Sequence, residues 1–347
     1  MLARYGRREI QSACKQPYLT WAHKRGDANM KSKFALAALA AVGAVVISGT
    51  LSAASDVKPQ NAGAPFNASG YYDFEITFSS DGKTAVWASN RPGGHGGNDL
   101  YYAEFKNGTW GPAINFGPAV NSGVNEQEAA MTDDGQVVYF TRYHDPKDFL
   151  SGDLYISRKV NGKWQKAQSW NDVPELPALN TPDGEEHCPI FVHKDLIYFS
   201  TNRKGTQASD IWQVARKNGV WGKPEPLPGT INSPHRDHIH WNNLSKDKKA
   251  LLVISDRPDG GSLGGSDEWI SRMNEKGEWS TPINLGPTVN SSGNEICWVP
   301  TPDGSFMGAT NRSGLGQGAL HFVKGTVLTL QGFEADTAAP INIFKIQ

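Results

Sequence analysis

Short runs of alternating apolar and polar residues recur along most of the chain, and Gly, Pro, Asn and Asp separate them. Apolar runs such as VVYF and LIYF are each followed by a second run, as in DLYISRKV and DIWQVAR. Runs of about four to eight residues between turn-forming residues are typical of β-strands joined in hairpins. The pattern predicts an all-β protein with almost no helix after residue 55.

These runs belong to a unit that returns five times along the chain. Each unit is marked by a triplet that ends in arginine: Ser89-Asn90-Arg91, Phe140-Thr141-Arg142, Thr201-Asn202-Arg203, Ser255-Asp256-Arg257 and Thr310-Asn311-Arg312. The arginines are 51, 61, 54 and 55 residues apart, and self-similarity at such a period is typical of a propeller or a solenoid. A tryptophan follows the second run in the first four units, at Trp110, Trp164, Trp221 and Trp279.

A unit of this size cannot bury both faces of its own sheet, so the units must pack on one another, and a closed ring leaves no sheet face exposed. PFNASGYYDFEITFSSDG, residues 65–82, matches PAVNSGVNEQEAAMTDDG, residues 118–135, so the first unit has its own inner strand. The sequence predicts a five-bladed β-propeller of four-stranded antiparallel blades. Residues 331–347 either close the ring or form an outer appendage.

The repeat, from the apolar run through SNRPGGHGGNDLYY to GTWGPAINFGPAVNS, resembles the TolB-type, WD40-like β-propeller repeat of bacterial envelope proteins. The resemblance is to the form also found beside OmpA-like domains, and it covers about residues 62–330. It implies a propeller at the cell envelope. A propeller is a platform whose activity lies in its sites, so the resemblance predicts the fold more strongly than the function.

The segment that begins at Met30, MKSKFALAALAAVGAVVISGTLSAAS, has two lysines, an uncharged apolar run and then small residues at a plausible cleavage site. This order is typical of a secretory signal peptide. We expect residues 1–29 to be an upstream mis-start, 30–54 the signal peptide and 55–347 a single propeller domain with a tail at 331–347. The alternatives are a cytoplasmic extension at 1–29 and a retained membrane anchor at 34–54. The predicted location is periplasmic or secreted, with no membrane span after cleavage.

Charge and cysteine content change once this leader is removed. Residues 1–54 hold eight of the 34 basic and two of the 35 acidic side chains, so the mature chain keeps 26 basic and 33 acidic ones, a net charge of −7. Nucleic acid is therefore not an expected partner. Cys14 is lost with the leader, which leaves Cys188 and Cys297 in an oxidising compartment. On non-adjacent blades these two are expected to lie too far apart for a disulfide.

Most of the repeated residues have a structural interpretation. An aspartate follows each of the first four unit arginines by 7 to 11 residues, a spacing that suits an ion pair across a hairpin loop. The expected pairs are Arg91–Asp99, Arg142–Asp153, Arg203–Asp210 and Arg257–Asp267. The tryptophans are interpreted as wedges between blades rather than as platforms for sugars.

The first strand of each unit is where the units differ in their chemistry. At one position of this strand, which we call the first level, the five units have Asp73, Glu126, Glu186, His238 and Glu295. Two residues later, at the second level, they have Glu75, Glu128, Cys188, His240 and Cys297. Residues two apart share a strand face, and the first strand of a propeller blade lines the centre, so two stacked rings are expected. The alignment of units three and four leaves open a shift of one residue, which would substitute Glu185 and Asp237 at the first level.

Three interpretations of these rings are open: a metal site, a catalytic site and a purely structural role. As metal ligands for zinc or copper, the candidates are His238, His240, Cys188 and Cys297, whereas the carboxylates alone would suit calcium or manganese. As catalytic acids and bases on a glycoside, the candidates are Glu126, Glu186 and Glu295. The candidate ligand-binding residues are Asp73, Glu126, Glu128, His238 and His240. In the structural interpretation, which we favour, the acidic residues cap loops and hold water.

The stretch HRDHIHWNN, residues 235–243, places three of the chain's nine histidines within six residues, so unit four is the one expected to be adapted for a ligand. The function favoured by the sequence is an exported binding or scaffold protein whose partner is an envelope protein, a peptide or a glycan. The alternative is a carbohydrate-active enzyme, a glycoside hydrolase or lyase, with its site at the centre of the ring and a possible dependence on a divalent metal.

Overall fold

The structure, a computed structural model, describes residues 60–68, 70–145, 148–287, 289–301, 306–310, 319–323 and 343–345. The chain divides into two units, Met1–Ser55 and Asp56–Gln347, and all the described residues belong to the second. The predicted mis-start and signal peptide lie outside the described residues, as does most of the predicted tail.

The described strands pair into five antiparallel sheets. Sheet one contains β2 (Asp73–Phe78), β3 (Thr84–Ser89), β4 (Asp99–Lys106), β5 (Thr109–Trp110) and β6 (Ile114–Asn115). Sheet two contains β7 (Asn125–Met131), β8 (Val137–Asp145), β9 (Asp148–Val160), β10 (Lys163–Trp164) and β11 (Gln168–Ser169). Sheet three contains β12 (Glu186–His193), β13 (Leu196–Thr201), β14 (Asp210–Lys217), β15 (Val220–Trp221) and β16 (Glu225–Pro226).

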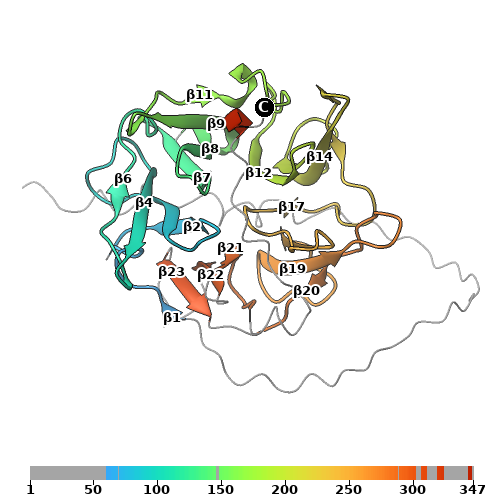
Figure 1. Cartoon of the computed structure of the whole chain (residues 1–347). Coiled ribbons are helices and arrows are strands. Elements are labelled where there is room, and N and C mark those ends of the chain that lie inside the picture. The colour runs from blue at the N-terminus through green and yellow to red at the C-terminus, as the bar shows by residue number, and fades with distance from the viewer. Residues whose placement is uncertain are drawn as a thin grey trace, which may run out of the picture. The chain divides into compact units, whose positions relative to one another are not determined.

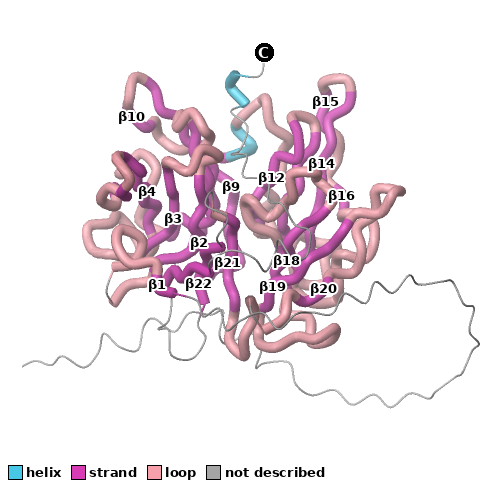
Figure 2. Tube along the Cα trace, turned by 60° about the horizontal axis from the view of Figure 1, so that its bottom comes forward, coloured by secondary structure: helices cyan, strands magenta, loops and turns pink. Residues whose placement is uncertain are grey.

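The two remaining sheets have four strands each. Sheet four contains β17 (Asp237–His238), β18 (Ala250–Ser255), β19 (Asp267–Arg272) and β20 (Ile283–Asn284). Sheet five contains β21 (Glu295–Pro300), β22 (Phe306–Thr310), β23 (Ala319–Val323) and β1 (Gln60–Asn61). In the described residues helix is limited to two short 3-10 turns, η3 (Trp170–Asp172) and η4 (Ile343–Lys345), shown in cyan in Figure 2. The all-β prediction is confirmed: every sheet has a path of four antiparallel strands, to which sheets one, two and three add a fifth short strand.

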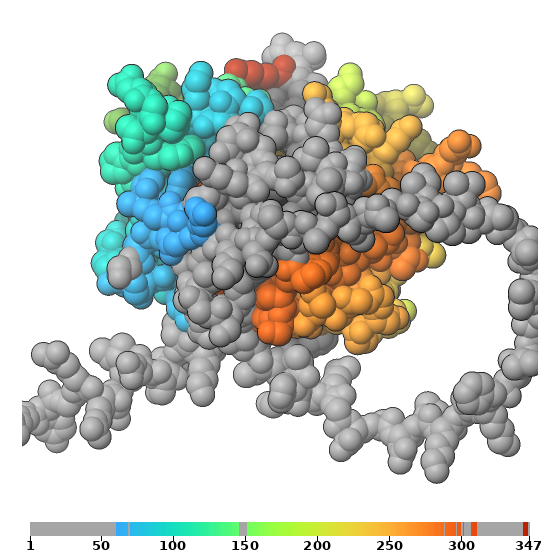
Figure 3. All heavy atoms as spheres, turned by 90° about the horizontal axis from the view of Figure 1, so that it is seen from below, coloured from blue at the N-terminus to red at the C-terminus, as the bar shows by residue number. Residues whose placement is uncertain are grey.

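The sheets follow one another around a common centre in a propeller-like arrangement (Figure 1). β2 contacts both β7 and β21, β7 contacts β12, β17 contacts β13 and β14, and β21 contacts β18 and β19. Figure 3 shows the residues of sheet one in blue on one side of the molecule and those of sheet four in yellow and orange on the other. The first strand of every sheet is thus the innermost one.

Sheet five takes its outermost strand from the other end of the described chain. β1 pairs antiparallel with β23, through Gln60 with Phe322 and Asn61 with His321. The last described residues do not pair with this sheet. Instead Ile343 is buried in an apolar cluster shared by sheets two and three, and the Lys345 ammonium lies 2.6 Å from the Asp134 carboxylate.

Apolar layers between neighbouring sheets form the core. Ile76 and Trp87 of sheet one pack with Val299 and Met307 of sheet five, and similar layers join sheets one and two, two and three, and three and four. The repeated tryptophans lie in or against these four layers, and Trp279 is only 1% exposed. They act as wedges between sheets, because burying an indole of 150–250 Å² stabilises the packed pair of sheets.

The predicted arginine pairs are corrected by the structure. Arg91, Arg203 and Arg257 bind an acid on the first strand of their own sheet, not the aspartate that follows along the chain. In sheet two the Arg142 Nε lies 2.8 Å from Glu126 Oε1. The downstream aspartates order their own loops instead: Asp99 Oδ2 accepts the backbone N–H of His95 at 2.7 Å, and Asp267 Oδ2 accepts that of Leu263 at 2.7 Å.

Candidate functional site

The first-level acids are held by their own loops. Glu126 accepts hydrogen bonds from the backbone N–H and hydroxyl of Ser122 as well as from Arg142. Glu186 does the same with Thr181 and Arg203, and Glu295 with Ser291. The first-level acids are all buried and hydrogen-bonded: Asp73, Glu126, Glu186, Asp237 and Glu295. Glu126, Glu186 and Glu295, the predicted catalytic candidates, each bond to the loop that precedes their strand, and their catalytic role stays a prediction.

In sheet four the first level is occupied by Asp237, and the placement of His238 there is wrong by one residue. Asp237 bonds Arg257 and the Ser233 hydroxyl, as the other first-level acids bond their arginines and loops. The prediction of Glu186 in sheet three is correct, because Glu186 and not Glu185 binds the arginine.

Four first strands carry an irregularity two residues beyond the acid. The strand register shifts by one residue between Phe74 and Thr77 in sheet one, and similar shifts occur in sheets two, three and five. At each shift a residue that is not glycine has a positive φ: Glu75 at 56°, Glu128 at 53°, Cys188 at 48° and Cys297 at 58°. Such a backbone costs about 1–3 kcal/mol each, clusters at functional sites, and re-aims the side chain of a bulged strand.

The first strand of sheet four differs from the others by two residues. The chain takes eight residues from Asp237 to Ser245, whereas it takes six from Asp73 to Ser79, and both serines donate their backbone N–H to the strand that follows. The longer path carries His240, Trp241 and Asn243 into the centre. Asn243 Oδ1 accepts the backbone N–H of His240 at 2.8 Å, and the indole N–H of Trp241 donates to the Glu128 carbonyl at 2.8 Å.

The five second-level residues come from five different sheets and are linked by contacts. Glu75 Oε2 accepts the backbone N–H of Glu128 at 2.9 Å. The His240 ring lies between the two thiols: Cys188 Sγ is 3.2 Å from Nδ1, and Cys297 Sγ is 2.9 Å from Nε2. All five are buried, with exposed fractions of 5% or less. We call Glu75, Glu128, Cys188, His240 and Cys297 the central cluster.

Two further histidines complete the surroundings of the central cluster. His187 Nδ1 lies 3.2 Å from Glu128 Oε1, and Thr141 donates to Glu128 Oε2 at 2.9 Å. His238 Nε2 lies 3.0 Å from His240 Nε2, while His238 Nδ1 is buried and has no hydrogen-bond partner among the described residues. His187 was not among the residues predicted from the sequence, although its place beside Cys188 in EEHCP was a signal that could have identified it.

Burial governs the protonation of these groups. Burial would raise the pKa of Glu128, but His187 and Thr141 hold it at about 2. Burial would lower the pKa of His187, but the Glu128 carboxylate raises it. Burial lowers the pKa of His240 to about 3 and raises the pKa of both thiols, Cys188 and Cys297, well above the ordinary value. At neutral pH and without a metal, Glu128 is therefore a carboxylate beside His187, and the thiols and His240 are neutral.

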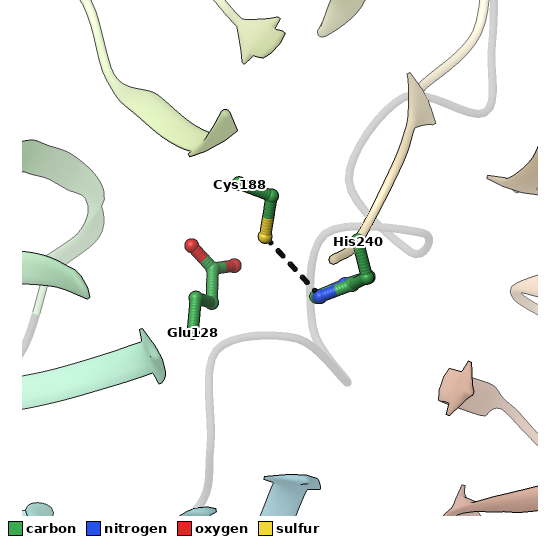
Figure 4. A group of neighbouring side chains, drawn as sticks. All are labelled: Glu128, Cys188 and His240. Atoms are coloured by element: carbon green, nitrogen blue, oxygen red, sulfur yellow. Dashed lines mark hydrogen bonds between the residues drawn. The ribbon is translucent and has the colours of Figure 1, made fainter. Parts of the chain in front are cut away.

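Glu128, Cys188 and His240 form a group that could hold a metal ion. One ligand atom from each lies within 4.8 Å of the other two, and Figure 4 shows the carboxylate, the thiol and the imidazole pointing toward one another. Thiolate and imidazole are preferred by zinc and copper, whereas calcium and manganese prefer oxygen ligands. The donor set therefore favours zinc or copper.

No protein-family model and no curated protein matches this chain. Among solved structures, a TolB protein from Agrobacterium tumefaciens is 14% identical, with 70% of this chain and 71% of that chain covered and a TM-score of 0.39. An alpha-L-arabinofuranosidase from Podospora anserina, in complex with cellotriose, is 12% identical, with 78% and 94% covered and a TM-score of 0.41. A prolyl endopeptidase is 11% identical over 74% of this chain, which spans only 36% of the endopeptidase chain, with a TM-score of 0.37. All three TM-scores are below 0.5, so these likenesses carry no argument about the fold or the function of this chain.

The described residues contain no helix that is long and apolar enough to cross a membrane.

Proposed function

We propose that this chain is an exported, non-catalytic β-propeller that binds a protein, peptide or glycan at the cell envelope. We infer that its five sheets are the five blades of one closed ring, because β2 contacts both β7 and β21. The periplasmic or secreted location rests on the signal-peptide pattern that begins at Met30. Amino-terminal sequencing of the exported protein tests it: we expect a start near Ser55, and a start near Met1 would contradict the location.

The first-level acids are already hydrogen-bonded within the protein, and this observation supports a binding role over catalysis. A general acid or base must reach a substrate proton within hydrogen-bond distance. Glu126 and Glu186 are fully buried, and each is already bonded to an arginine and a loop hydroxyl. Glu295 is likewise buried and bonded to Ser291 and Thr310.

A carbohydrate-active enzyme is the second candidate, and one observation favours it. Burial raises the pKa of Glu185 to about 7, whereas the pKa of Glu128 is held at about 2. Two carboxyl groups whose pKa values are moved apart are the usual acid and base of a glycosidase. In this alternative the reaction would involve Glu128 and Glu185 in place of the first-level acids.

The two functions are separated by assaying the purified mature chain on a panel of polysaccharides, with and without added zinc. We expect that a polysaccharide, peptidoglycan or an envelope protein retains the chain, and that no sugar product is released. Release of a reducing or unsaturated sugar end that is lost in Glu185→Gln would contradict the binding role and establish the enzyme. Glu104→Gln, on β4 with a side chain that is 45% exposed, is the matched control.

A further inference from the structure

We propose that the central cluster is a zinc site in which Cys188 Sγ, His240 Nδ1 and a carboxylate oxygen of Glu128 bind the ion. Cys297 and His238 contact the opposite nitrogen of His240 and do not bind the ion. The site ties sheets two, three and four together at the centre of the ring. The zinc site is independent of the partner that the propeller binds. If the zinc site is disproved, the proposed binding function is unaffected, and the reverse also holds.

The first support is the spacing of the ligand atoms. Zinc binds a thiolate at about 2.3 Å and an imidazole nitrogen at about 2.0–2.1 Å, so two such ligands on a tetrahedral ion lie about 3.5 Å apart. Cys188 Sγ and His240 Nδ1 are 3.2 Å apart. A movement of a few tenths of an ångström would thus admit the ion between them, with Glu128 within reach.

The second support is that the two nitrogens of the His240 ring contact different residues. Nδ1 faces Cys188, whereas Nε2 faces Cys297 Sγ at 2.9 Å and His238 Nε2 at 3.0 Å. A histidine that binds zinc through one nitrogen usually donates the N–H of the other to a neighbouring acceptor, which fixes the ring. Binding through Nδ1 leaves the Nε2 proton for Cys297 or His238.

The third support is that His240 and Glu128 are already oriented by their surroundings. The backbone of His240 is held by Asn243, whose side-chain amide also donates to the Trp298 carbonyl at 3.2 Å. Thr141 and His187 fix the two carboxylate oxygens of Glu128. Outer contacts of this kind typically surround metal ligands and are needed for full affinity.

The fourth support is charge balance in a buried site. One dication, the Cys188 thiolate and the Glu128 carboxylate sum to zero, and buried charges are tolerated when they are paired or bind a metal. Binding releases the thiol proton of Cys188 to solvent.

The test is the metal content of the full chain, exported and purified under reducing conditions without chelator and then loaded with zinc. We expect about one zinc per chain, lost in Cys188→Ser and retained in Cys297→Ser with an affinity about tenfold weaker. Cys297→Ser is the matched control, because both thiols are buried and contact the same imidazole. A wild-type chain that binds no zinc after loading, or a Cys188→Ser chain that still binds it, would overturn the site.

Cobalt provides a readout that does not depend on a folded cysteine variant. Co²⁺ bound to the wild-type chain is expected to show the near-ultraviolet absorption of a thiolate ligand, and Glu128→Gln is expected to weaken its binding by at least tenfold. A cobalt complex with no thiolate absorption would contradict the proposal. Binding that is undisturbed by Glu128→Gln but abolished by Cys297→Ser would place the ion on Nε2 and overturn the assignment of Nδ1.

Discussion

The unit arginines show what residue spacing along a chain can and cannot predict. The spacing of Arg257 and Asp267 suits a hairpin, but Arg257 lies across the sheet against Asp237 of β17, and its Nη2 also donates to the Ile231 carbonyl at 2.9 Å. Such an arginine can pair either with the aspartate that follows it along the chain or with the acid on the first strand of its sheet. The register of the first strand determines which of the two acids lies beside it. That register was the uncertain part of the sequence alignment.

Removing the arginine should therefore destabilise the protein strongly. Arg257→Met leaves Asp237 buried without its partner, and the free energy of unfolding is expected to fall by about 3–5 kcal/mol. Arg216→Met, which breaks the more exposed pair of Arg216 with Asp195, should cost about 0–1 kcal/mol. Denaturant unfolding at pH 7 measures both, and equal losses would contradict the structural role of the buried pair.

Asp210 gives the protein a pH dependence that can be measured. Burial, with the nearby charge of Asp237, raises the pKa of Asp210 from 3.8 to about 6. A carboxyl whose folded pKa is raised contributes stability that is complete below its unfolded pKa and is lost as the pH rises through the folded value. Between pH 4 and pH 6 the free energy of unfolding should fall more in the wild type than in Asp210→Asn. Parallel pH profiles for the two chains would contradict this.

At the scale of elements, strand content and the inward face of the first strands could be predicted, whereas the local backbone could not. Alternation and turn residues identify β3, β8, β13 and β18 as strands. They do not reveal the left-handed residues, since Glu75, Glu128, Cys188 and Cys297 are types that rarely adopt a positive φ. The two additional residues of sheet four were visible in the spacing from Asp237 to Ser245, but they have meaning only once the strands are paired.

The pairing of β1 with β23 joins distant parts of the chain and was not predicted. Both strands are short, and β1 has only Gln60 and Asn61. A chain that starts at Ala62 should be less stable by about 1–2 kcal/mol than one that starts at Gln60, because it loses these strand hydrogen bonds and exposes the edge of β23. Comparison of the two chains by denaturant unfolding tests this. Equal stability would mean that β1 does not contribute to closure.

At the scale of the whole molecule, the five repeats predicted the succession of sheets, because each repeat is one sheet and neighbouring sheets bury one another. The sequence also placed Cys188, His240 and Cys297 on inner strands, and the structure brings them into one cluster. Which nitrogen of His240 faces which thiol could not be predicted, because that depends on the longer path of sheet four and on side-chain packing at the centre.

X-ray diffraction from crystals of the zinc-loaded chain, with data collected at the zinc absorption edge, locates a bound zinc ion directly. We expect five sheets around one centre and a single anomalous peak there. That peak should lie about 2.0–2.3 Å from Cys188 Sγ, His240 Nδ1 and a carboxylate oxygen of Glu128. A centre without an anomalous peak, or a peak between Cys297 Sγ and His240 Nε2, would contradict this expectation.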